Sequence, residues 1–218
     1  PASVNNLTSE NYIGMSRGVA FQSPIAEGVG SSVQYKTASI ADNYPVIFDS
    51  NSNKTVIAYQ DAGDSNKGKA RVGTVSGTSI SFGTEATWST SNLYQGVNGV
   101  FDSSNNKIVI VYRDSGNSSY GTAIIGTVSG TDITFGSPVV FNSANSFWFG
   151  IAFYSTNNKV VIAYRDQGNN SGYGSAIVGT VSGTSISFGS EATLESSVCS
   201  KYELAYDTTN QKNRCSIH

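Results

Sequence analysis

The chain has little of what most enzymes use for chemistry. Its one histidine is His218, the last of 218 residues, so a histidine-based triad has no place and no His/Cys cluster has zinc spacing. Arg113 and Arg165 recur in the repeats described below, but Gln60 stands at the corresponding position of the first repeat, which weakens a sialidase-like three-arginine site. No pair of carboxylates is singled out for glycoside hydrolysis. We therefore expect no enzymatic activity, no catalytic residue, no metal and no cofactor.

Charge is also scarce. Only 13% of the residues are charged and the net charge is -2, so the chain lacks the basic field that nucleic acid requires. No apolar run approaches the roughly 18 residues of a membrane-spanning helix. We expect no nucleic-acid partner and no membrane insertion. The richness in Ser, Thr, Asn, Gly and Tyr suits an extracellular, cell-surface or virion-surface β protein.

The chain has two cysteines, Cys199 and Cys215, which both lie in the last twenty residues. One interpretation is a local disulfide between them, which depends on how closely their backbones approach. The other is that Cys215 is a buried small apolar residue, because it takes the repeat position held by Ile57, Ile110 and Ile162.

Three stretches of the chain are near copies of one another. "KTVIAYQDAGDSNKGKARVGTVSG", "KIVIVYRDSGNSSYGTAIIGTVSG" and "KVVIAYRDQGNNSGYGSAIVGTVSG" begin at Lys54, Lys107 and Lys159, and Lys212 opens a partial fourth copy. The spacings of 53, 52 and 53 residues are typical of a propeller blade. In the second unit, β-branched and aromatic runs predict strands over residues 99–103, 107–114, 121–129 and 131–141.

The turn residues agree with antiparallel strands. Asn105-Asn106 and Asn157-Asn158 are placed for a two-residue hairpin, in which Asn tolerates a positive φ. The sequences "KIVIVY" and "KVVIAY" are apolar on both faces, which predicts small sheets sandwiched between neighbours. The next hairpin is expected at Ser76-Gly77, Ser129-Gly130 and Ser182-Gly183.

These patterns predict an all-β fold, a single β-propeller domain of four four-stranded blades. The two ends of the chain complement one another, because the C-terminus holds two strands of a blade and the N-terminus offers "YIGMSRGVAFQ" and "SSVQYKTA". Completion within one chain closes the propeller, whereas completion by a neighbouring chain builds a head-to-tail fibre. The expected parts are N-terminal strands in 1–43, blades in 44–96, 97–148 and 149–200, and a half blade in 201–218.

The phrase "VIAYRDxGNxxxGxAxVGTVSGTSISFG" resembles the repeat of large Ser/Gly/Thr-rich proteins of aquatic phages and bacteria, many of them tail-fibre-like or adhesin-like. The similarity covers roughly residues 44 to 194. Segments similar to "NLTSENYIGMS", Asn6 to Ser16, lie beside such arrays in those relatives. The resemblance implies a surface-exposed structural or binding module and carries over no catalytic residue.

In a four-stranded blade, the loops after the second and fourth strands emerge on one face. This long-loop face would hold "RDSGNSSYG" (113–121) with its copies, "STSNLYQGVNG" (89–99) and "NSANSFWFG" (142–150). Aromatic rings beside amides and carboxylates suit sugar binding. The alternative is that aromatics such as Phe147 and Phe149 seal gaps between blades. The candidate ligand-binding residues are Asp61, Asp114, Asp166, Tyr94, Tyr120, Tyr173 and Trp148.

The repeated aspartates have two further interpretations. A calcium site would pair Asp61 with Asp64 and treat the copies in the same way, but one carboxylate and an amide supply too few oxygens. The favoured alternative is that each Asp caps its own turn while a glycine supplies a positive φ. The copies are Asp114 with Asn117 and Asp166 with Asn169, and the glycines are Gly63, Gly116 and Gly168.

Asn-x-Ser/Thr sequons permit glycosylation at four positions, and two of these share a repeat position on the long-loop face. They are Asn6, Asn53, Asn117 and Asn169, of which Asn117 and Asn169 correspond.

We expect a non-enzymatic extracellular or virion-surface module that is structural and adhesive. Its partners would be glycans or cell-surface polymers, bound weakly and at several places. The first alternative is a fibre subunit that assembles with copies of itself by strand exchange. The second is a glycan-processing enzyme.

Overall fold

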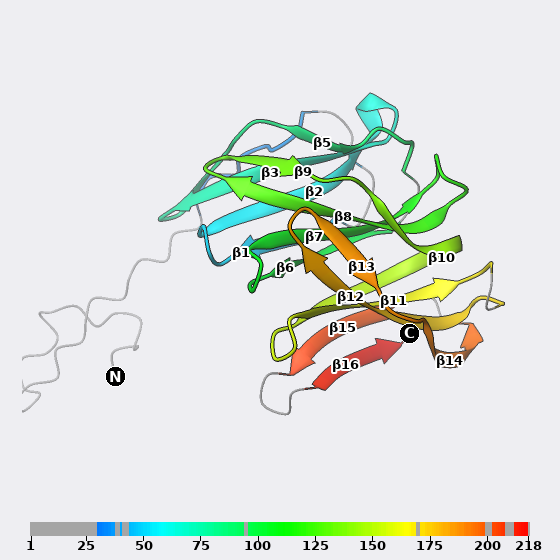
Figure 1. Ribbon diagram of the computed structural model, residues 1–218. Coiled ribbons are helices and arrows are strands. Elements are labelled where there is room, and N and C mark those ends of the chain that lie inside the picture. The colour runs from blue at the N-terminus through cyan, green and yellow to red at the C-terminus, as the bar shows by residue number, and fades with distance from the viewer. Residues whose placement is uncertain are drawn as a thin grey trace, which may run out of the picture.

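The computed structural model describes residues 30–37, 40, 44–93, 96–168, 171–198, 202–207 and 212–217 (Figure 1). In this part of the chain nearly all regular structure is antiparallel β-strand, and the one helical element is the single-turn η3, Ala62–Asp64. The predicted all-β class is therefore confirmed. No helix in the described ranges is long and apolar enough to cross a membrane.

The first repeat folds into one antiparallel sheet, unit 1. Its strand order is β1-β2-β3-β4, and β5 also pairs with β3. Because β4 and β5 pair with successive halves of β3, together they form the fourth strand of the sheet. The bounds are β1 Val46–Asp49, β2 Lys54–Asp61, β3 Lys67–Ser76, β4 Ser79–Phe82 and β5 Ala86–Ser89.

Units 2 and 3 repeat this plan and share one long strand. The first half of β10 pairs with β8 of unit 2, and its second half pairs with β11 of unit 3. Unit 2 contains β6 Val97–Asp102, β7 Lys107–Asp114, β8 Tyr120–Ser129, β9 Asp132–Phe135 and the start of β10 Val139–Tyr154. Unit 3 contains the end of β10, β11 Lys159–Asp166, β12 Tyr173–Ser182, β13 Ser185–Phe188 and β14 Ala192–Val198. The C-terminal hairpin is β15 Tyr202–Asp207 and β16 Lys212–Ile217.

Strand register confirms the period read from the lysines. Each of these lysines lies opposite the last residue of the preceding strand, with partners Asp49, Asp102, Tyr154 and Asp207. Leu204 lies opposite Cys215, just as Val46 lies opposite Ile57, so Cys215 has the expected repeat position. Its side chain and the whole of Cys199 lie outside the described residues, so the disulfide remains a prediction.

Two details of the strand predictions were wrong. The expected single strand over residues 131–141 is divided into β9 and β10, since Pro138 has no N–H for the ladder and Gly136 turns toward unit 3. β10 then continues across the expected blade boundary at 148/149.

The asparagine hairpin also differs from the prediction. Four residues, not two, separate Asp102 from its partner Lys107. Asp102 stabilises this longer loop, because its Oδ1 accepts hydrogen bonds from the backbone amides of Ser104 (3.0 Å) and Asn105 (3.1 Å). Only the second asparagine, Asn106, has a positive φ, of 53°. The hairpins expected at the Ser-Gly pairs are two-residue loops, but the loop residues are Gly130 and Thr131, because Ser129 pairs with Asp132; Gly130 has φ 62°.

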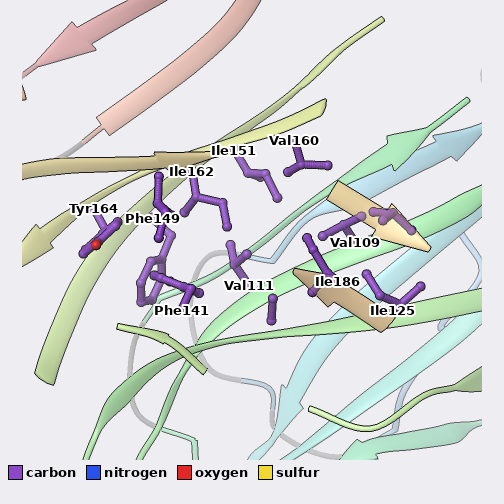
Figure 2. Close-up of a cluster of buried hydrophobic side chains, with 13 residues drawn as sticks. Val109, Val111, Ile125, Phe141, Phe149, Ile151, Val160, Ile162, Tyr164 and Ile186 are labelled. Carbon is purple, nitrogen blue, oxygen red and sulfur yellow. The ribbon is translucent and has the colours of Figure 1, made fainter. Parts of the chain in front are cut away.

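The core lies between consecutive units. Alternate residues of β7 face opposite ways: Ile108 and Ile110 pack in the cluster with unit 1, whereas Val109 packs in the cluster with unit 3. Figure 2 shows this second cluster, in which Val111 lies near Ile162 and Phe141, and Ile125 lies near Ile186. Each fully buried side chain of this size stabilises the fold by about 1.5–3 kcal/mol. The sequence prediction that both faces are covered is thus confirmed for unit 2.

The first strands of the units follow one another in space. β1 contacts β6, β6 contacts β10, and β10 contacts β15, so the sheets form a stacked row (Figure 1). In the described part of the chain β15 and β16 pair only with each other, and closure of the row into a ring is not seen.

The N-terminal strand runs are only partly in view. "YIGMSRGVAFQ" lies outside the described residues. Ser31 to Thr37 are described but form no strand, and Ile40 makes an isolated bridge with Asp61 of β2.

Candidate functional site

The loops that the sequence assigned to one face do gather there. The backbone amide of Leu93, between units 1 and 2, donates to the carbonyl of Asn66 in the β2–β3 loop (2.9 Å). The amide of Gln167, in the β11–β12 loop, donates to the carbonyl of Asn145 in β10 (2.9 Å), and that of Ser146 donates to Ser119 (3.2 Å). In the described residues each of these three loops is thus hydrogen-bonded to an inter-unit connection.

The three repeated aspartates serve the loops themselves. The backbone amides of Gly63, Gly116 and Gly168 each donate to the aspartate two residues earlier, at 3.0, 3.0 and 3.2 Å. Asp61 and Asp166 are buried, whereas Asp114 is half-buried. The turn-capping interpretation is confirmed. The described residues contain no group of three or more His, Cys, Asp and Glu that could hold a metal ion.

The expected source of positive φ in these loops was wrong. Gly63, Gly116 and Gly168 do not have a positive φ. The strained positions follow them and are mostly serine or asparagine, whose small polar side chains hydrogen-bond locally. They are Ser65, Asn66, Ser118, Ser119, Ser171 and Gly172.

Asp61 also belongs to a charged cluster that is completed by Lys36, a residue outside the complete repeats. The Nζ atom of Lys36 lies 2.5 Å from Oδ2 of Asp61 and 3.0 Å from Oε2 of Glu85. The hydroxyl of Tyr59 donates to the same Glu85 oxygen (2.5 Å). Burial alone would raise the pKa of Glu85, but the bonds from Tyr59 and Lys36 outweigh it and hold this pKa below 4.5. The hydrogen bond to Asp61 raises the pKa of Lys36.

Trp148 is the most exposed aromatic side chain described on the long-loop face. It retains 36% of its accessible surface and lies in β10 at a register shift between Phe147 and Gly150. Its φ of 54° is left-handed, a conformation that a bulky residue rarely adopts and that strains the backbone. An aromatic ring is thus held at the surface against its backbone preference.

Polar groups surround Phe147, the residue before Trp148 in the chain. The guanidinium carbon of Arg113 lies 4.6 Å from the ring centroid of Phe147, a cation–π contact. Nε of Arg113 donates to Oδ1 of Asn145 (3.0 Å). Gln60 at the equivalent position of unit 1 donates to the carbonyl of Leu93. These side chains therefore hold the inter-unit connections and do not converge as three arginines.

The other aromatic candidates are less exposed than Trp148 where they are described. Tyr120 and Tyr173 are half-buried at the first positions of β8 and β12. Phe149 is buried, with its ring centroid 5.9 Å from that of Phe141, so the alternative of sealing between units is confirmed for it. Tyr94 lies outside the described residues.

Two of the four sequons lie in the described residues. Asn53 and Asn117 are exposed, and Asn53 has a positive φ in the β1–β2 hairpin. Asn6 and Asn169 lie outside the described residues. Glycosylation at all four positions stays a prediction.

Sequence reasoning singled out Trp148 but missed the polar contacts of its chain neighbour Phe147. Asn92 stands at the position equivalent to Asn145, 53 residues earlier, but Gln60 takes the place of Arg113 in that unit, so the Arg–Asn pair carries no repeat signal. Comparison with protein-family models, curated proteins and solved structures found no match.

Proposed function

We propose that the chain is a non-catalytic structural and adhesive module of an extracellular or virion surface that binds glycans weakly through its long-loop face. The observation that carries this proposal is the display of Trp148, exposed and held in a strained left-handed conformation. Backbone strain persists where the surrounding structure imposes it, and it is concentrated at functional sites.

The chemistry around Trp148 suits a sugar. An indole ring stacks on the apolar face of a pyranose, and hydroxyls then need hydrogen-bonding groups at the rim. Arg113 and Asn145 supply such groups next to Phe147. Half-buried Tyr120 and Tyr173 extend the same face, so several weak contacts together would give avidity.

The architecture that we propose for this module is the four-bladed propeller. It is supported by three equivalent four-stranded sheets, by the succession β1, β6, β10 and β15, and by the extra hairpin β15–β16 that follows unit 3. Closing such a row removes exposed sheet faces. Apolar side chains at both ends of the row also favour a second candidate, a fibre subunit joined head to tail.

A glycan array tests the proposed activity. The wild-type chain should bind a defined subset of glycans, and Trp148→Ala should weaken this binding about fivefold, which corresponds to ~1 kcal/mol. Val75→Ser is the matched control, since Val75 is an exposed apolar residue next to the opposite Ser-Gly hairpin. Equal binding by wild type and Trp148→Ala across the array would contradict the proposal.

A further inference from the structure

One close contact recurs between successive units. A glycine after the first part of the fourth strand lies so near a threonine carbonyl of the next unit that a Cβ on the glycine would overlap it. Each pair is 48 residues apart: Gly30 with Thr78, Gly83 with Thr131 and Gly136 with Thr184. The contact is thus a marker of how one unit packs on the next.

Gly30 shows that the N-terminal segment packs on unit 1 like part of a preceding unit. Tyr35, five residues later, supports this, because its ring centroid lies 5.3 Å from that of Tyr59 in β2. The corresponding contacts at the next two boundaries are Trp88–Tyr112 at 4.9 Å and Phe141–Tyr164 at 5.1 Å. Residues 30–37 therefore pack on unit 1 in the way that the fourth-strand segment of one unit packs on the next.

At the other end of the row, unit 3 lacks this cover. Around Gly189, the repeat equivalent of Gly136, the nearest described heavy atom to a Cβ is the carbonyl oxygen of Val178, at 3.8 Å. Val178 and Leu194 are 44% and 41% exposed. Their equivalents in units 1 and 2 are all buried: Val72 and Ile125, and Trp88 and Phe141. We call Val178, Gly189 and Leu194 the unit 3 end face.

In unit 1 the exposed part is the first strand and not the fourth. Its outer half is covered by Tyr35, but Val46 and Phe48 of the first strand are 67% and 57% exposed. Ile151, the equivalent of Val46 in unit 3, is buried. The inner half of unit 3, by contrast, is covered, because Ala163 packs with Tyr202 of the C-terminal hairpin. Each end of the row is thus exposed where the other end is covered.

We infer that the unit 3 end face is the docking surface for residues 1–29 of the same chain, and that β15–β16 docks on Val46 and Phe48. Together with residues 30–37, residues 1–29 would supply the second half of a further unit, whose first half is the hairpin β15–β16. Because both halves belong to one molecule, their pairing has an effective concentration in the millimolar range.

The repeat period predicts which N-terminal residue would lie over Gly189. At the other boundaries the glycine lies under a threonine, as Gly30 lies under Thr78, and the residue one period of 53 residues before Thr78 is Ile25. Pro24 then falls at the position of Gly77, whose φ of 58° proline cannot adopt. The inferred docking therefore requires a turn before Ile25 that differs from the Ser-Gly hairpins of the other units.

Glycine substitutions test this docking. Neither Gly136 nor Gly189 has a positive φ, so alanine there acts through space alone. Gly136→Ala should lower the melting temperature of the full chain by about 5 °C or more, because the methyl group overlaps Thr184. If residues 1–29 cover the unit 3 end face, Gly189→Ala should do the same. A stable Gly189→Ala protein beside a destabilised Gly136→Ala protein would overturn the inference.

A second variant and a second measurement keep the test decisive. Leu194→Ser should lower the melting temperature by about 4 °C or more if the side chain is covered, whereas an uncovered Leu194 would tolerate serine. Sedimentation from about 1 to 100 μM should show a monomer throughout; growth with concentration would overturn same-chain docking in favour of a second copy.

The inference rests on the proposed four-bladed architecture and not on the proposed glycan. Both tests are made without ligand. If they fail, the glycan-binding result for Trp148→Ala can still be interpreted independently.

Discussion

The rings of Trp88 and Tyr112 meet edge to face across the boundary between units 1 and 2, with centroids 4.9 Å apart and planes at 66°. Nε1 of Trp88 also donates to the carbonyl of Lys69 (2.8 Å). Both residues are buried, and burial raises the pKa of Tyr112. The contact joins two sheets that share no strand, so it is a point at which their stacking can be measured.

Trp88→Ala should lower the free energy of unfolding by about 3–5 kcal/mol, because it leaves a cavity between two sheets and an unpaired carbonyl. Urea denaturation followed by fluorescence measures this change. Phe141→Ala should cost a similar amount at the next boundary. A loss below about 1 kcal/mol for Trp88→Ala would show that units 1 and 2 do not stack through this ring.

The cluster of Lys36, Tyr59 and Glu85 should make stability depend on pH. The folded pKa of Glu85 lies below 4.5, so its contribution is full above about pH 4.5 and is lost as the pH falls through the lowered folded value. Glu85→Gln should therefore cost about 1 kcal/mol at pH 7 and much less at pH 3. Melting curves at both pH values, with Asp132→Asn as an exposed control, measure the difference.

Asp102 should be more important for stability than an ordinary loop aspartate. It is fully buried, its Oδ1 accepts two backbone amides, and its Oδ2 accepts Nδ2 of Asn105 at 2.8 Å. Asp102→Ala should cost about 1–3 kcal/mol, since it leaves these donors unpaired. Chemical denaturation should show a much smaller loss for Asp132→Ala at the exposed start of β9. Equal losses for the two variants would remove the capping role.

Trp148→Gly should separate stability from function. Glycine adopts φ 54° without strain, so this variant should be about 1 kcal/mol more stable than the wild type. It should also lose the glycan binding that we propose for the exposed ring. The comparison needs both a denaturation curve and an array. A destabilised variant would show that the indole stabilises the fold and is not strained for display.

The repeat made most strands predictable, and its exceptions have non-local causes. β7 and β11 begin at the predicted lysines because a hydrophobic run and a turn mark both of their ends. The break before Pro138 reflects the approach of Gly136 to Thr184, which lies in another unit. A single period also cannot reveal Lys36, which lies outside the complete copies and yet pairs with Asp61.

The sequence predicted where the candidate site lies, but it did not predict the burial and backbone conformation of its residues. Antiparallel pairing alone puts the interstrand loops on one face, which the contacts of Asn66 and Asn145 confirm. Burial of Asp61 and Asp166 depends on how the connections fold over the loops. The backbone of Trp148 could not be foreseen, since tryptophan has no preference for a left-handed conformation.

The continuous strand β10 gives the molecule an uneven response to force. Units 2 and 3 are joined by unbroken backbone that is hydrogen-bonded to β8 on one side of the joint and to β11 on the other. Tension between these units therefore loads both ladders along their length, in shear. Tension between units 1 and 2 acts instead on the separate connection after β5. Under load the chain would extend first at that connection, and units 2 and 3 would hold together as one mechanical body.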